Sequence, residues 1–164
     1  MMSGIRSRTS LPKTVPPVGD TSSVEFYTAH PTSSTAWRLA VLMGANSRTY
    51  KFALATALLE HAAEGRTEAT LQDLARPYAM SIAEHLQQMP QSPGATLGES
   101  DFLTIAQQES EQTLALGAPT ERLIDAAVQS MPSMVMQKFH NLAGGTEIPH
   151  RFYALEGRGN RRIV

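Results

Sequence analysis

The sequence predicts a mainly α fold, a compact helical domain with a small C-terminal β-hairpin. Apolar residues recur at helical spacing through the middle of the chain, and capping residues and glycines bracket those stretches. Near the C-terminus the pattern changes to short strand-like runs. The chain has 164 residues, of which 41% are hydrophobic and 18% charged, which suits one domain of ordinary size.

Two regions are expected along the chain. Residues 1–20 are rich in Ser, Pro and Gly without an apolar period, and are predicted to form a flexible N-terminal arm. Residues 21–164 are predicted to form a single helical domain, which opens with a short extended piece over Val24–Thr28.

Two helices are predicted in the first half of this domain. The cap-forming run Ser33–Thr35 precedes a helix that carries Trp37 and ends at Gly44. The strongest helix spans about residues 47–64, because its apolar side chains repeat at intervals of four and Gly65 ends it.

The next helix contains a proline. It is predicted to begin at Thr70, with Asp73 three residues later as its partner in a capping box. Pro77 pushes Arg76 away from helical dihedral angles. We therefore expect either a kink at the proline or a new helix that opens there.

Two further helices and a hairpin complete the predicted fold. Helices are expected over about 100–115 and 119–130, with a proline at the first position of the second. Residues 131–142 are apolar, and their secondary structure is ambiguous from the sequence. The tail, residues 148–164, is predicted to form a β-hairpin around the Gly-Arg-Gly-Asn turn at 157–160.

Composition excludes several classes of protein. No apolar run approaches the roughly 18 residues that span a bilayer, and the N-terminus lacks a signal-peptide pattern, so no membrane partner is expected. Cysteine is absent, which removes disulfides, thiolate nucleophiles and Cys-based zinc sites. A cytoplasmic location is the resulting expectation.

Charge is unevenly distributed although the net charge is only −1. From Pro77 to Glu121 there is no Lys or Arg, whereas Arg151, Arg158 and Arg162 lie near the C-terminus. Such segregation predicts one acidic face and one basic face in the folded chain. Chance clustering of solvated charges is the alternative.

No enzyme site emerges from the sequence. The pairs Glu60-His61 and Glu84-His85 lack the spacing that places two imidazoles on one metal, and neither a nucleophile elbow nor a phosphate loop is present. His140 lacks the second histidine that a one-metal nuclease needs. We therefore predict no catalytic residues, no metal ligands and no cofactor.

The start of the strongest helix is a candidate anion site. Helix N-termini present unpaired N–H groups and a partial positive charge, which favour phosphate. Ser47 is placed there, and Arg48 and Lys51 add full charges one turn apart. The alternative is that Ser47 caps the helix and both cations are solvated.

Two further groups of residues could contact nucleic acid. Arg76 to Ala79, with Pro77 and Tyr78 between them, place a guanidinium beside a small apolar surface. The alternative is a kinked helix with Tyr78 in the core. The second group can reach base edges or phosphates, and consists of His140, Asn141, His150, Arg151 and the basic run from Arg158 to Arg162.

A resemblance covers roughly residues 34–155. The run SRTYKFALATALLEHAAEGRTEATLQDLARPYA and the later KFHNLAGGTEIPHRFY resemble the N-terminal region of bacterial, HNH-type, modification-dependent (type IV) restriction endonucleases. Within that group they are most similar to the DNA sulfur-binding domains, which recognise double-stranded DNA with a phosphorothioate in its backbone. The chain stops where an HNH module would begin, so the resemblance implies an isolated recognition domain without cleavage activity. The C-terminal HNH nuclease module would belong to the full-length protein.

The resemblance also implies where the modified group binds. A phosphorothioate keeps its charge, but its sulfur is larger, softer and less hydrated than oxygen, so a shallow apolar cup beside a cation would accept it. The implied cup consists of Arg76, Pro77, Tyr78 and Ala79. The resemblance implies that the modified phosphate or a neighbouring one is bound by Ser47, Arg48 and Lys51.

The resemblance further implies that base choice falls to the loops near His30 to Ser34, which include Ser33, and to the stretch from His140 and Asn141 to His150 and Arg151. Two alternatives stay open: a general or base-modification-reading DNA-binding module, and a helical protein–protein adaptor that uses the acidic face. A homodimer is compatible with either kind of DNA reader.

Overall fold

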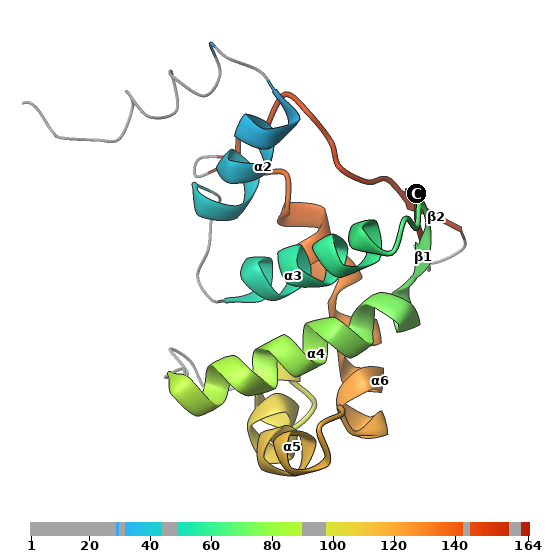
Figure 1. The fold of residues 1–164 in the computed structure, drawn as a ribbon. Helices are drawn as coiled ribbons and strands as arrows, with labels where there is room; N and C mark the ends of the chain where they lie inside the picture. Colours follow the sequence, from blue (N-terminus) through green and yellow to red (C-terminus); the bar gives the residue numbers. More distant parts are fainter. Residues whose placement is uncertain (1–28, 30–31, 44–48, 90–97, 143–144, 158–161) are drawn as a thin grey trace, which may run out of the picture.

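The computed structural model describes residues 29, 32–43, 49–89, 98–142, 145–157 and 162–164. The prediction of a mainly α fold with a small β element is confirmed (Figure 1). The helices are α2 (Ser33–Leu42), α3 (Tyr50–Ala63), α4 (Leu71–Gln88), α5 (Phe102–Leu116), α6 (Glu121–Ser130) and the π-helix η1 (Pro132–Met136), and the strands are β1 (Ala69–Thr70), β2 (Leu155–Glu156) and β3 (Arg162–Ile163). The predicted arm at 1–20, the extended piece at 24–28 and Gly44 lie outside the described residues.

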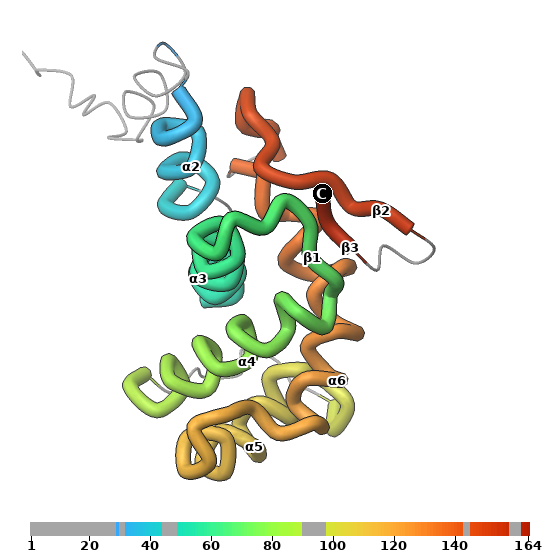
Figure 2. The backbone as a smooth tube through the Cα atoms, turned by 45° about the vertical axis from the view of Figure 1, so that its right-hand side comes forward, coloured from blue at the N-terminus to red at the C-terminus, as the bar shows by residue number. Residues whose placement is uncertain are grey.

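Helix α4 is the centre of the packing. It contacts α3 on one side and α5 and α6 on the other (Figures 1 and 2). The helix is amphipathic, and its apolar face is buried. The largest side chains of the shared core include Leu54, Leu74, Tyr78, Leu103 and Leu123. Within the part of the chain that the structure covers, no helix has the length and apolar character needed to cross a membrane.

Capping residues explain where two of the helices begin. The capping box predicted at Thr70 and Asp73 is confirmed, because each side chain accepts a hydrogen bond from the other residue's backbone N–H. The cap predicted within Ser33–Thr35 is one residue too late. Thr32 is the N-cap of α2, and it forms a capping box with Thr35.

The ends of the other helices fit the predictions to within a turn. Gly65 follows α3 with a φ of +73°, and Gly117 ends α5 with a φ of +66°, backbone conformations that glycine adopts without steric cost. Helix α6 begins at Glu121, because Thr120 caps it through Leu123 N–H. Pro119 therefore precedes this helix, and the prediction that it is the first helical residue is wrong by two positions.

Pro77 lies inside α4, and the helix continues through it. The expectation that a new helix opens at this proline is wrong. The proline removes one backbone hydrogen bond, but Leu74, Tyr78 and Ile82 on the same helix are buried against α3, α5 and α6. Burial of this face holds the helix together across the missing bond.

The predicted C-terminal hairpin is present and gains a strand. Strands β2 and β3 are antiparallel, with Leu155 opposite Ile163. Ile163 also faces Ala69, because β1 pairs antiparallel with β3 and makes β3 the central strand. Strand β1 was not predicted, and it is only two residues long. The turn at 158–161 lies outside the described residues.

Candidate nucleic-acid interface

Lys51 lies in the first turn of α3, but its side chain is buried. The residue is 2% exposed, and its ammonium donates hydrogen bonds to the carbonyl oxygens of Asn141 at 2.8 Å, Phe139 at 3.0 Å and Ala40 at 3.5 Å. Burial lowers the pKa of Lys51 to about 8. The prediction that Lys51 grips a phosphate is wrong in this structure, because all its contacts are with backbone carbonyls.

His140 is buried too. Its Nε2 accepts a hydrogen bond from the Phe152 backbone N–H at 3.1 Å, and its own carbonyl accepts one from Ile148 N–H at 2.8 Å. Burial lowers the pKa of His140 to about 4, and the neighbouring Arg151 contributes in the same direction. The ring is neutral at physiological pH and enclosed, so the prediction that it contacts bases is wrong.

Together Lys51 and His140 join three stretches that are far apart in the sequence. The lysine connects the end of α2 and the start of α3 to the turn at 138–141, and the histidine connects that turn to residues 148–152. The end of α2, the start of α3 and the 138–152 stretch are therefore packed against one another. Ser47 and Arg48, which precede α3, and His30 lie outside the described residues.

The predicted cup at Arg76 to Ala79 does not form an open surface. Tyr78 is 1% exposed and Ala79 fully buried, and the Tyr78 ring stacks on Phe102 at a centroid distance of 5.5 Å. The burial raises the pKa of the Tyr78 hydroxyl well above its usual value. Arg76 is exposed and lies 3.6 Å from the Glu121 carboxylate, while Pro77 is half-buried. The prediction fails because residues 78 and 79 fall on the core face of α4.

Two aromatic rings and an exposed arginine are adjacent in the sequence at residues 150–152. We call these residues the 150–152 surface: His150, Arg151 and Phe152. The His150 and Phe152 rings meet edge to face at 5.1 Å, and Arg151 is exposed and donates to the Glu147 carboxylate at 2.7 Å. Asn141, another predicted contact, is half-buried and forms an isolated antiparallel β-bridge with Glu147. His150 and Arg151 were predicted contacts, whereas the role of Phe152 was missed.

Two exposed cations of the described residues are without an ion pair. Arg38 on α2 and Lys138 in the turn next to Phe139 are exposed, and among the described residues neither forms an ion pair. The acidic stretch found in the sequence lies on the later turns of α4 and on α5. Those helices are separated from α2 by α3 (Figure 1). The two described C-terminal arginines, Arg151 and Arg162, pair with Glu147, Glu68 and Glu156, so acidic groups are not confined to one side and the segregation of charge stays a prediction.

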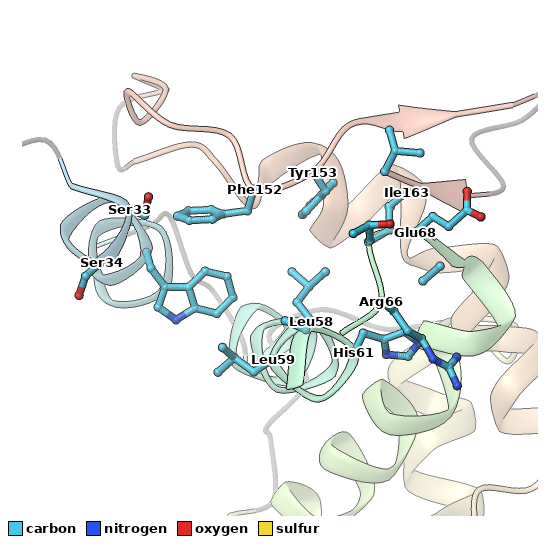
Figure 3. Close-up of a pocket in the computed structure, with 15 residues that line it drawn as sticks. Ser33, Ser34, Leu58, Leu59, His61, Arg66, Glu68, Phe152, Tyr153 and Ile163 are labelled. Carbon is cyan, nitrogen blue, oxygen red and sulfur yellow. The ribbon is translucent and has the colours of Figure 1, made fainter. Parts of the chain in front are cut away.

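A pocket of about 370 Å³ opens on the same side, between α2, the second half of α3 and the C-terminal strands. Figure 3 shows Phe152 and Ser33 at one end, Arg66 and His61 at the other, and Leu58 between them. Trp37 also lines it and packs edge to face on Phe152 at 5.0 Å. We call it the α2–α3 pocket. Ser33, predicted as a base contact, lies on its rim and is exposed.

No cluster of potential metal ligands is found within the described ranges. No family model, curated protein or solved structure matches the chain. The site is therefore defined by its geometry: two buried polar side chains that join distant segments, an exposed aromatic and cationic surface, and an adjoining pocket.

Proposed function

We propose that this chain is a recognition module for double-stranded DNA that carries a backbone phosphorothioate, and that the modified group binds at the 150–152 surface. The observation that carries the proposal is the joining of α2, the start of α3 and residues 138–152 by Lys51 and His140. These hydrogen bonds hold segments that are far apart in the sequence against one another, which supports a single binding surface built from their exposed residues.

The chemistry of the 150–152 surface suits a soft anion. Arg151 supplies a charged donor for the retained negative charge, and the rings of His150 and Phe152 offer an apolar wall for the weakly hydrated sulfur. Arg151 now pairs with Glu147, but both side chains are more than half exposed. Such a surface pair is worth only about 0–1 kcal/mol, so a phosphate can replace the carboxylate at little cost.

The neighbouring cations set the strength of general DNA binding. Arg38, Lys138 and Arg151 are exposed, and we expect each of them to contact a phosphate. Three phosphate contacts correspond to a slope of about −3 in a plot of log affinity against log salt concentration. Binding is thus expected to be moderate, which accords with the net charge of −1.

The proposal extends to the setting in which such a module works. It would act in the cytoplasm as the non-catalytic recognition part of a modification-dependent restriction endonuclease, with an HNH nuclease module supplying cleavage. A homodimer would let two copies read the two strands of one site.

The test is a titration with two duplexes of identical sequence, one of which carries a single phosphorothioate, at fixed physiological salt. We expect tighter binding to the sulfur duplex. His150→Ala should reduce this preference, and Arg151→Ala should weaken binding to both duplexes. Arg76→Ala is the matched control, because this exposed arginine lies in the predicted cup and away from the 150–152 surface.

Each contrary result points to a different conclusion. Loss of the sulfur preference in Arg76→Ala, with His150→Ala unaffected, would return the site to the middle of α4. Equal affinity of the unmodified protein for both duplexes would indicate a general or base-modification-reading DNA module. Absence of binding to either duplex would favour an adaptor that uses the acidic helices.

A further inference from the structure

The α2–α3 pocket has the size and the walls of a ligand site. Its volume of about 370 Å³ falls within the range of about 300–1,000 Å³ typical of small-molecule pockets. Trp37 and Phe152 form an aromatic end, and Leu58 and Leu59 form an apolar side. Leu59 is 54% exposed.

The pocket also has polar residues in its lining, all exposed except the half-buried His61. Ser33 and Ser34, from the first turn of α2, line the aromatic end, where the Ser34 hydroxyl points away from Phe152, and the charged residues Arg66 and Glu68 lie farther along (Figure 3). Aromatic walls with hydrogen-bonding groups at the edge suit a flat ring that has apolar faces and a polar edge. Heteroaromatic rings, above all nucleobases, have this chemistry.

The position of the pocket connects this ring to DNA. Phe152 belongs both to the pocket and to the 150–152 surface, and Arg151 precedes it directly. A duplex whose backbone lies on that surface would pass next to Phe152, which lines the pocket. We propose that the α2–α3 pocket receives a nucleobase unstacked from DNA bound at the 150–152 surface, an inference that rests on the proposed function.

Unstacking a base costs a few kcal/mol, and the cost is smallest where the base is mispaired. A mismatch at the target position should therefore tighten binding by about tenfold, which corresponds to about 1.4 kcal/mol. Trp37 is the only tryptophan in the chain, so its fluorescence reports directly on the pocket. We expect binding of the mismatched duplex to quench this fluorescence.

The experiment measures affinity and tryptophan fluorescence for four probes: a phosphorothioate duplex fully paired, the same duplex with a mismatch beside the modified group, the same duplex with an abasic site there, and free nucleosides. The abasic duplex should bind without quenching. Ala62→Phe should abolish the mismatch advantage and the quenching, because Ala62 lines the pocket. Ala63→Phe should change neither, because Ala63 is exposed on the same helix but does not line the pocket.

Three results would overturn the inference, and they differ from one another. Equal affinity for paired and mismatched duplexes without quenching, but with the sulfur preference intact, would refute base capture and leave the proposed function standing. Quenching by free nucleosides without any duplex binding would assign the pocket to a nucleotide ligand instead of DNA. Absence of both duplex binding and fluorescence quenching would refute the proposed function together with the inference.

Discussion

Protonation of His140 gives the fold a pH dependence that can be measured directly. The ring is buried, its Nε2 accepts a hydrogen bond from Phe152 N–H, and its pKa in the folded protein is about 4 instead of 6.5. A proton on Nε2 would occupy the position of this acceptor and place a charge in the core. The unfolded chain therefore binds this proton at higher pH than the folded protein does.

The size of the effect follows from the two pKa values. The gap between 6.5 and about 4 corresponds to about 3 kcal/mol of unfolding free energy. Because the folded-state pKa is the lower one, this stability is fully present above pH 6.5 and is lost as the pH falls towards 4. About 2 kcal/mol of the loss falls between about pH 7 and about pH 4.5.

The assay is urea unfolding of the unmodified protein and of His140→Gln at about pH 7 and about pH 4.5. Glutamine keeps a neutral acceptor near the position of Nε2 but does not titrate. Carboxylates titrate in both proteins, so their contribution cancels in the comparison. We expect the unmodified protein to lose about 2 kcal/mol more than the variant on acidification. Equal losses in the two proteins would refute the assignment of this pH dependence to His140.

Three further predictions concern stability. Lys51→Met leaves two buried carbonyls and one half-buried carbonyl without their charged donor and should lower the unfolding free energy by about 3 kcal/mol in urea titration. Tyr78→Ala should cost about 3 kcal/mol or more by the same assay, because the ring lies in the core. Thr113→Val should raise the melting temperature by about 2–4 °C, because the buried Thr113 hydroxyl has no hydrogen-bond partner in the described structure.

Each of these has a contrary outcome of its own. Unchanged stability in the Lys51→Met protein would mean that water satisfies the three carbonyls. A stable Tyr78→Ala protein that has lost only its preference for sulfur would restore the predicted cup. A lower melting temperature for Thr113→Val would mean that the threonine hydroxyl makes a contact whose stabilising free energy exceeds the cost of desolvating the hydroxyl.

Much of the helical architecture could be predicted because it depends on local chemistry. The capping box at Thr70 and Asp73 and the ending of α3 at Gly65 are properties of a few adjacent residues. The hairpin could also be recognised from its turn. The strand β1 could not, because two residues become a strand only when β3, more than ninety positions later, pairs with them.

The candidate site was harder to predict because burial is decided by distant segments. Helical periodicity places Tyr78 on the same face as Leu74 and Ile82, a signal that could have assigned it to the core. Nothing near Lys51 in the sequence indicates that carbonyls from residues 139 and 141 would enclose its ammonium. A lysine in the first turn of a helix is usually solvated, so its structural role emerges only in the fold.

The lysine that joins these segments also bears on the order in which the molecule assembles. Its contacts close loops of 88 and 90 residues, which costs chain entropy before any contact is gained. Helices α4, α5 and α6 are consecutive and pack on one another, so we expect them to form the folding nucleus and α2 to join late. Hydrogen exchange should then show α2 opening more readily than α4, and equal protection of the two helices would contradict this order. A duplex bound across α2 and residues 150–152 would hold together the part of the protein that is completed last, and should slow exchange in α2 while leaving α4 unchanged.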